Sequence, residues 1–268
     1  MKEYLNSILT YNLNTGIKIL GYSIIIPYRD RKQHLEMLLP ALFEKFKDED
    51  YEIIVSEQDD DKSFSIAKVY SVAILNSKYD NLIFQQVDYI PTKDVDYSIG
   101  DYECVLPCQR GIFLDSHNTG LRPIYDIPSG YRAWNNKIDE SFYGGVLCIT
   151  RDALDKVNGF NVLYDGWGNE DEDFRERIKF HNINVNRNKV GTFYCLHHRD
   201  NGDFNINKKE SEDFIKGRKI YKNYQDFLKI GYKNLKFNSK KEIINIQGKE
   251  IIWIKSNEFE VIVDEGKK

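Results

Sequence analysis

Four acidic residues follow one another at a single place in the chain, where residues 166–178 read GWGNEDEDFRERI. Neighbouring carboxylates repel each other, so this run needs a physical reason. A helix predicted over 170–182 supplies part of it, because the dipole and the free N–H groups at a helix N-terminus stabilise acidic side chains. Such capping explains any one of the four acids, but it does not explain the Gly-Trp-Gly that precedes them.

A tryptophan between glycines, next to carboxylates, is an arrangement suited to holding a sugar. The glycines allow a tight turn that presents the indole of Trp167 at a surface. The ring then packs on the C–H groups of a sugar, while carboxylates accept hydrogen bonds from its hydroxyls. A carboxylate in that place is also able to act as a general base on an acceptor hydroxyl.

The four acids cannot all share one role, because successive residues of a helix point about 100° apart. We expect Glu170 and Asp171 to face a cleft as ionised carboxylates. Glu172 and Asp173 are expected to turn toward the helix cap or the body of the domain. The mutation of each acid should therefore have a different effect.

The composition is that of an ordinary globular chain. Of its 268 residues, 41% are hydrophobic and 30% are charged. The net charge is −4, so the composition does not indicate a basic surface for binding nucleic acid. Aromatic residues reach 13%, which fits an aromatic-lined site for sugars or bases, although a tyrosine-rich core gives the same figure. The length allows one large domain, or one domain with an appendage.

Targeting and redox signals both favour a cytoplasmic location. No stretch approaches the roughly 20 apolar residues of a membrane span, and the first residues lack the apolar core of a signal peptide. The four cysteines form no CxxC pair. Free thiols in a reducing cytosol are their simplest interpretation.

The first third of the chain alternates strands with helices. Apolar runs predict strands at 22–31, 51–58 and 81–91, and helical spacing predicts helices at 32–46 and 63–77. This order indicates a parallel α/β sheet with right-handed crossovers. Ligands of such sheets bind at the carboxyl ends of the strands, where Pro27 to Arg31 and Asp88 fall.

Beyond residue 91 the pattern is less regular. Residues 92–141 are polar, aromatic and rich in turn residues, and a long irregular segment inside a compact domain usually has a function. Later elements are predicted as strands at 142–150, 185–188 and 192–198, helices at 151–157, 170–182 and 208–230, and a small β-meander at 242–264. We therefore divide the chain into a domain at 1–205 and a helical and β-hairpin extension at 206–268.

Four motifs occur in the order of a known family. FYGGVLCITRDALDKVNGFNVLYDGWGNEDEDFRERI at 142–178 resembles the C-terminal signature of the β-1,4-galactosyltransferase family, and IIIPYRDRKQHLEMLLPAL at 24–42 resembles its first strand. FSIAKVYSVAI at 64–74 and LIFQQVDYIP at 82–91 resemble its next helix and strand. The Trp-Gly-x-Glu-Asp block also recurs in polypeptide N-acetylgalactosaminyltransferases and bacterial chondroitin polymerases. The resemblance implies a GT-A fold, which is a Rossmann-like mixed sheet flanked by helices, and a nucleotide-sugar transferase.

The resemblance implies contacts to the donor for a set of matching residues. They are Pro27, Tyr28, Arg29, Arg31, Phe64, Val87, Asp88, Gly145 and Trp167. The arginines would lie near uracil and diphosphate, since a guanidinium donates two parallel hydrogen bonds to phosphate. Without the other motifs, arginines after a strand are ordinary surface charge. The donor would be a UDP-linked hexose or N-acetylhexosamine.

A divalent metal is implied by the same alignment. Asp88 matches the second Asp of the family's Asp-Val-Asp motif, and His198 matches its downstream metal-binding His. Cys195 falls on a Met ligand, and His197 takes the place of His198 if the register differs by one. One carboxylate with diphosphate oxygens holds Mn²⁺, or in second place Mg²⁺, whereas a thiolate suits Zn²⁺ better. A lone Asp at a strand end is otherwise a turn residue.

The acidic block would carry catalysis. By the resemblance, Asp171 would be the general base of an inverting transfer, Glu170 would bind the acceptor hydroxyl, and Trp167 would pack against donor sugar or acceptor. The acceptor would be a glycan, a glycolipid or another hydroxyl compound. Residues 92–141 would form a mobile wall over the donor pocket. The family's membrane anchor and luminal stem have no counterpart, which predicts a cytosolic relative from a bacterium or a virus.

Departures from the family pattern lie on the donor side. Gln86 replaces the first Asp of the metal motif, Ile66 replaces an Arg, and Asn169 replaces a Gly. Phe142 stands where the family tunes the C2 substituent of the donor. These changes leave the identity of the transferred sugar open.

Three alternative functions remain beside inverting transfer. The Trp-Gly-x-Glu-Asp block also occurs in retaining transferases of the same fold. Gln86 and Ile66 are compatible with a carbohydrate- or nucleotide-binding module without turnover. A nucleic-acid-modifying glycosyltransferase would fit a phage, but the lysines around 205–241 are scattered rather than gathered in a basic patch.

Overall fold

An eight-stranded mixed sheet forms the centre of the protein. The computed structural model describes residues 21–107, 110–114, 143–166, 168–196 and 208–262. The strand order is β10-β11-β2-β1-β3-β7-β5-β8. The bounds are β1 Tyr22–Tyr28, β2 Tyr51–Gln58, β3 Asn81–Gln85, β5 Cys104–Leu106, β7 Val146–Thr150, β8 Val185–Arg187, β10 Leu235–Ile246 and β11 Lys249–Val261. β1 pairs in parallel with both β2 and β3, which confirms the parallel sheet predicted for the first third of the chain.

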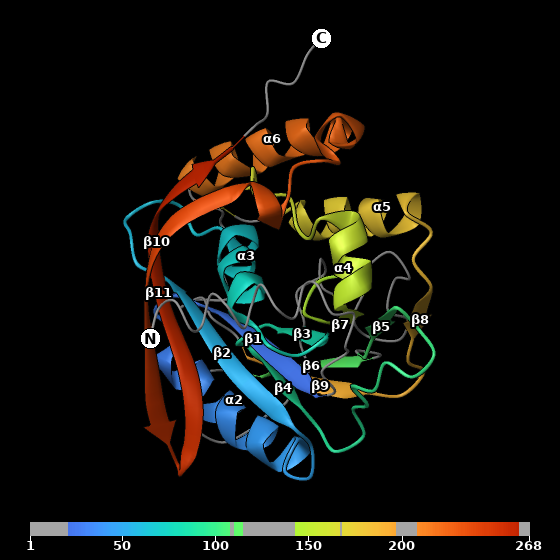
Figure 1. Cartoon of the computed structure of the whole chain (residues 1–268), viewed down its shortest axis with the longest axis vertical. Coiled ribbons are helices and arrows are strands. Elements are labelled where there is room, and N and C mark those ends of the chain that lie inside the picture. The colour runs from blue at the N-terminus through green and yellow to red at the C-terminus, as the bar shows by residue number, and fades with distance from the viewer. Residues whose placement is uncertain (1–20, 108–109, 115–142, 167, 197–207, 263–268) are drawn as a thin grey trace.

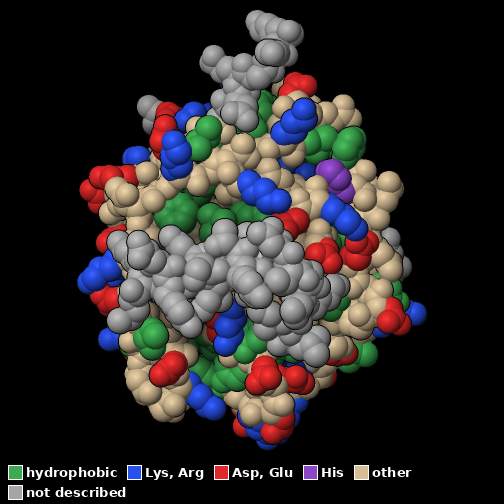
Figure 2. All heavy atoms as spheres, in the orientation of Figure 1, with side chains coloured by type: hydrophobic (Ala, Val, Ile, Leu, Met, Phe, Trp, Pro, Cys, Tyr) green, Lys and Arg blue, Asp and Glu red, His purple; other side chains and the backbone are tan. Residues whose placement is uncertain are grey.

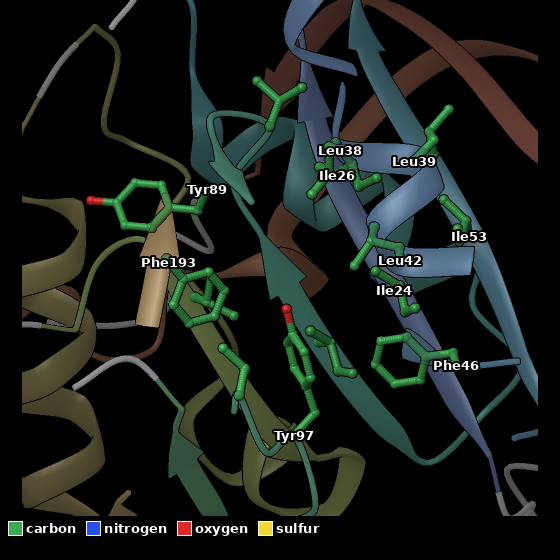
Figure 3. Close-up of a cluster of buried hydrophobic side chains, with 14 of the residues drawn as sticks. Ile24, Ile26, Leu38, Leu39, Leu42, Phe46, Ile53, Tyr89, Tyr97 and Phe193 are labelled. Carbon is green, nitrogen blue, oxygen red and sulfur yellow. The ribbon is translucent and has the colours of Figure 1, made fainter. Parts of the chain in front are cut away.

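Helices cover both faces of this sheet, as Figure 1 shows. Side chains of a strand alternate between faces. Ile24 and Ile26 of β1 therefore pack with the leucines of α2 (Lys32–Lys45), while Ile25 packs on the opposite side. Figure 3 shows Ile24 and Ile26 beside Leu38 and Leu42. The opposite face is covered by α3 (Ile66–Asn76), α4 (Arg151–Val157) and α5 (Glu170–Phe180).

The strand predicted over 81–91 is broken into two, which corrects the sequence interpretation. β3 ends at Gln85, and the N–H of Gln86 donates to the carbonyl of Gly145 at 3.0 Å. A turn closed by a 3.2 Å bond from the Tyr89 N–H to the Gln86 carbonyl follows. The chain thereby leaves the central sheet and enters a second sheet of order β4-β9-β6, with bounds β4 Tyr89–Pro91, β9 Thr192–Leu196 and β6 Arg110–Leu114.

The C-terminal hairpin continues the central sheet. β10 and β11 are joined at Gln247 and Gly248, whose φ angles of 53° and 79° are those of a type I′ turn. β11 then pairs in parallel with β2, from Ile252 opposite Ile54 to Ser256 opposite Gln58. The hairpin itself was predicted for the extension, but the structure has one long hairpin in place of a small meander, and it joins the edge of the main sheet.

A helix and two short turns lead into this hairpin. α6 spans Lys208–Lys222, and the 3₁₀ turns η2 (Tyr224–Phe227) and η3 (Tyr232–Asn234) follow it. Within the described ranges, no helix is long and apolar enough to cross a membrane. On the face shown in Figure 2, the Lys and Arg side chains lie scattered among acidic ones. Residues 115–142, most of the segment predicted as a wall, are outside the described residues.

Candidate active site

One pocket collects residues from α3, the end of β3, the Gly-Gly segment before β7, and the start of α5. Its space of about 280 Å³ is partly open to solvent. The described lining residues are Ile66, Tyr70, Phe84, Gln86, Tyr143, Gly144, Gly145, Val146, Leu147, Phe160, Glu170 and Asp171. The structure thus brings together three of the predicted site residues, Gly145, Glu170 and Asp171. Two of the departures from the family pattern, Ile66 and Gln86, line the same pocket.

The four acids of α5 have different surroundings, as the helix geometry predicted. Glu170 and Asp171 line the pocket. Glu172 forms a partly exposed ion pair with Arg218 of α6 at 2.9 Å. Asp173 is fully buried and accepts hydrogen bonds from Arg177, at 2.5 Å, and from the Tyr164 hydroxyl, at 3.0 Å. Of the four acids, Glu170 and Asp171 are therefore the two that line the pocket.

Burial changes the expected charge of the two pocket acids. The Oε2 atom of Glu170 is closed off from solvent and has no hydrogen-bond partner among the described residues. Desolvation, and secondly the neighbouring Asp171, raises the pKa of Glu170 to about 8. Desolvation also raises the pKa of Asp171, against the hydrogen bond that its Oδ1 accepts from the Glu172 N–H at 2.9 Å. The raised pKa favours the protonated form of Glu170 at neutral pH, which differs from the expectation that both acids are ionised.

The turn before α5 accommodates Asn169 in place of a glycine. Asn169 has a φ of 75°, in the left-handed region where Asn is tolerated better than most residues. Its side chain is buried, and its Oδ1 accepts from Arg218 at 3.4 Å. The substitution is therefore compatible with the same turn. Trp167, predicted to contact sugar, lies outside the described residues.

The donor-side arginine is held by protein groups. Arg29 donates to the carbonyls of Lys62 at 2.7 Å and Asp60 at 3.0 Å, and to the Asp60 carboxylate at 3.1 Å. Its guanidinium also lies 5.5 Å from the centroid of the Phe64 ring. Arg29 therefore fixes the loop between β2 and α3 that carries Phe64. In this structure its hydrogen bonds go to that loop, which differs from the predicted contact to diphosphate.

Tyr28 and Pro27 lie inside the protein. Both are buried at the end of β1, and the Tyr28 ring packs edge-on against Trp253 of β11 with centroids 5.0 Å apart. Val87 is buried in the core, and Arg31 is half-buried. Tyr28 therefore faces the C-terminal hairpin. The sequence had predicted that it contacts the donor.

Asp88 lies at the turn between the two sheets. The side chain is half-buried, and its carbonyl accepts a 2.8 Å hydrogen bond from the N–H of Leu196. This bond brings Asp88 beside the last described residue before His197 and His198, which lie outside the described ranges. A half-exposed carboxylate at a strand end fits one ligand of a divalent ion bound with diphosphate.

Cys195 does not fit a metal ligand. It is 2% exposed, belongs to the cluster of buried apolar side chains beneath α2, and has its Sγ 3.9 Å from the Phe193 carbonyl. Among the residues that the structure describes, no group of three or more His, Cys, Asp and Glu side chains is arranged to hold a metal ion. The ligand role predicted for Cys195 is therefore not supported by its place in the core.

Several pocket residues carried no signal in the sequence. Tyr70, Phe84 and Phe160 form an aromatic group in which Tyr70 lies 4.7 Å from Phe84 and 5.1 Å from Phe160, measured between ring centroids. From the sequence alone, these three residues look like core residues. One signal was available for Tyr70: it lies four residues after Ile66, on the same face of the helix, and Ile66 matches a predicted donor contact of the family. These three rings supply much of the apolar lining of the pocket.

Two family models match the chain. The N-terminal region of glycosyl transferase group 7 matches residues 11–104, and a model described as the N-terminal domain of galactosyltransferase matches residues 130–199. Together they include the site residues from Pro27 to His198. α6 and the C-terminal hairpin lie beyond both models.

Curated relatives agree with these models. Beta-1,4-galactosyltransferase 4 of Rattus norvegicus is 32% identical over 191 residues, which are 68% of this chain and 50% of the relative. The Homo sapiens protein of the same name is 33% identical over 190 residues, with the same coverage. The chain therefore spans about half the length of the curated relatives it matches.

Solved structures share the fold. A variant of Drosophila beta-1,4-galactosyltransferase 7 with manganese, UDP-Gal and xylobiose has a TM-score of 0.66 and 22% identity, covering 89% of this chain and 94% of that one. GalNAc-T7 with UDP, GalNAc and Mn²⁺ has a TM-score of 0.52 and 10% identity, covering 78% and 50%. These similarities confirm the predicted GT-A fold. With the two matching models and the curated relatives, they lead to one conclusion: the chain belongs to the β-1,4-galactosyltransferase-like family.

Proposed function

We propose that the protein is an inverting glycosyltransferase that moves a sugar from a UDP-linked donor to a hydroxyl of a saccharide acceptor. The observation that carries this proposal is the meeting of Glu170 and Asp171 with Gly145 and Gln86 in one pocket. That pocket lies where β3 ends, the edge of an α/β sheet at which ligands bind. Family membership and the donor and acceptor in the Drosophila neighbour's structure support the same reaction class.

Asp171 is the base in this proposal. It takes the proton from the acceptor hydroxyl as that oxygen attacks the anomeric carbon from the face opposite the leaving diphosphate. Partial burial raises the pKa of Asp171, which makes its carboxylate a stronger base than an exposed one. Its bond to the Glu172 N–H holds one carboxylate oxygen in place and leaves the other for the hydroxyl.

Glu170 and Asp88 have supporting roles. Glu170, neutral at the pocket wall, donates a hydrogen bond to a substrate oxygen. Asp88 would hold a divalent ion together with the donor diphosphate. The structures of two neighbours contain Mn²⁺. An ion of this kind would supply positive charge to the leaving group.

Donor and acceptor screening tests the proposal. The chain is incubated with MnCl₂, one of UDP-Gal, UDP-Glc, UDP-GalNAc or UDP-GlcNAc, and a panel of mono- and disaccharides. We expect acceptor-dependent UDP release with one donor, and a β-linked product by NMR if transfer from the α-linked donor inverts. An α-linked product would assign a retaining mechanism. UDP binding without UDP release or product, with every donor, would assign a binding module.

A further inference from the structure

α6 lies against the turn that leads into the acidic helix. It sits beside α5 at the end of the molecule opposite α2 (Figure 1). Its residues fall outside both matched family models, which end at residues 104 and 199. One face of α6 contacts three of the residues of the Gly166–Asn169 turn.

Asp213 of α6 contacts two separate parts of the site. Its Oδ2 accepts a 2.6 Å hydrogen bond from the Ser63 hydroxyl, 150 residues away in the chain. Its side chain also fills the space beside Gly166, since a Cβ added to that glycine would lie 2.5 Å from the Asp213 Cβ. Gly166 has a φ of 76° and needs this conformational freedom as well as the space.

The next contacts of α6 continue along the turn. A Cβ added to Gly168 would lie 3.1 Å from the Phe214 ring. Arg218 donates to the Asn169 Oδ1 at 3.4 Å and to the Glu172 carboxylate at 2.9 Å. α6 therefore touches the chain on both sides of position 167 and at the first turn of α5.

The β2–α3 loop and this turn also bond to each other. The Gly166 N–H donates to the Phe64 carbonyl at 2.9 Å, and the Ser65 hydroxyl donates to the Tyr164 carbonyl at 2.5 Å. Asp213 lies at the junction, because Ser63 and Gly166 belong to the two segments that these bonds join. A single carboxylate thus connects the loop carrying Phe64 with the turn that positions Glu170 and Asp171.

We propose that α6 is a positioning element of the active site, and that Asp213 couples the donor-side loop at Ser63 to the acidic turn at Gly166. Asp213 acts through these segments and does not touch the reacting atoms. Its effect on turnover rests on the proposed glycosyltransferase function, whereas its effect on the order of the turn does not. The two are therefore measured separately.

Hydrogen exchange of the full-length chain measures the order of the turn. In Asp213→Ala, amides in peptides covering 160–172 should exchange on the order of tenfold faster, as expected when a charge-assisted hydrogen bond is lost. Asp213→Asn keeps an acceptor oxygen and should stay within about twofold of the wild type. Glu212→Ala is the matched control, because Glu212 is the exposed acidic neighbour on the same helix.

Ser63→Ala removes the same bond from the other side. It should reproduce the change of Asp213→Ala, and the double variant should add little to either one. Unchanged exchange over 160–172 in both single variants would overturn the proposal. So would faster exchange spread equally over the whole chain, because that pattern reports global destabilisation and no local coupling.

Turnover provides the second readout. With the donor found by screening, Asp213→Ala should lower kcat at least tenfold while the Kd for UDP stays within about twofold. Normal kcat in a variant with a loosened turn would overturn the catalytic part of the proposal. If the wild type itself transfers no sugar, the proposed function fails, and the exchange data alone decide whether Asp213 holds the turn.

Discussion

Arg177 donates a hydrogen bond from its Nε to the Asp173 carboxylate, one turn earlier in α5, at 2.5 Å, and neither side chain is exposed to solvent. Three of the four remaining guanidinium N–H groups donate to the carbonyls of Val157, Leu228 and Phe227. Asp173 is held in turn by Tyr164 and Asn161. Every nitrogen and oxygen of the two charged groups therefore has a hydrogen-bond partner, and the pair joins α5 to the end of α4 and to the end of η2.

Asp173→Ala should destabilise the fold. The substitution leaves the Arg177 guanidinium buried without its carboxylate, and breaking a buried pair in this way costs about 3–5 kcal/mol. The free energy of unfolding from urea titration measures this loss. Asp173→Asn should lose less, because the amide oxygen still accepts a hydrogen bond. Glu172→Gln is the control on the same helix turn, and its exposed pair with Arg218 should be worth at most about 1 kcal/mol.

Asp171→Asn should remove the general base without removing the pocket. We expect turnover to fall about a hundredfold or more, the scale of a lost general base. The affinity for UDP should stay near that of the wild type. Initial rates and calorimetric titration with UDP give the two quantities. Near-normal turnover in Asp171→Asn, combined with lost turnover in Glu172→Gln, would show that the base has been assigned to the wrong acid.

The stability of the fold should depend on pH through Glu170. Burial raises its pKa to about 8, so the folded state holds a proton that the unfolded chain releases near pH 4.5. The stabilising effect of this proton is complete below pH 4.5 and is lost as the pH rises to about 8. Glu170→Gln has no proton to lose at this position. The difference in free energy of unfolding between this variant and the wild type should therefore increase through this pH window and level off above it.

Urea unfolding at several pH values between 4 and 9 measures that difference. The gain of Glu170→Gln is expected to reach a few kcal/mol, from about 1.4 kcal/mol for each unit of pKa shift. Glu172→Gln serves as the control, since its pair is partly exposed. A constant difference between Glu170→Gln and the wild type at all pH values would contradict the raised pKa.

UDP binding should depend on a divalent metal through Asp88. Mn²⁺ should increase the UDP affinity and EDTA should decrease it, because Asp88 would hold the ion together with the donor diphosphate. Asp88→Ala should abolish this dependence. Cys195→Ala should keep it, because Cys195 lies in the core with its Sγ near the Phe193 carbonyl. UDP affinity that is unchanged by EDTA in the wild type would exclude the metal site.

Hydrophobic runs allowed the central strands and their helices to be predicted from the sequence. The run from Tyr22 to Tyr28 is apolar on both faces, as a strand with helices on both sides requires. The break after Gln85 was missed because NLIFQQVDYIP reads as one continuous run. Only the bond from Gln86 to Gly145, 59 positions later in the sequence, marks where the chain turns.

The site was predictable only where motifs carried it. Glu170, Asp171 and Gly145 stand in quoted motifs, and they meet in the pocket. Arg29 binds the Asp60 carboxylate instead of a diphosphate. Tyr28 packs on Trp253, which lies 225 positions away in the sequence. Tertiary packing determines such partners, and local sequence patterns do not reveal them. The aromatic group around Tyr70 was hidden for a related reason, since buried side chains of a pocket and of a core are of the same types.

The parallel pairing of β11 with β2 delays the completion of the core until β11 has been synthesised. Ile251 and Ile254 of β11 are fully buried, one in the apolar cluster on each face of the sheet. The Trp253 indole reaches Glu57 across a sequence separation of 196 residues. Until β11 has left the ribosome, the preceding part of the chain therefore has β2 as an open edge with apolar side chains beside it. Such an edge is prone to pair with other chains, and contacts of this sequence separation form slowly. A nascent chain of this kind therefore has most need of chaperones before β11 is available to cover β2.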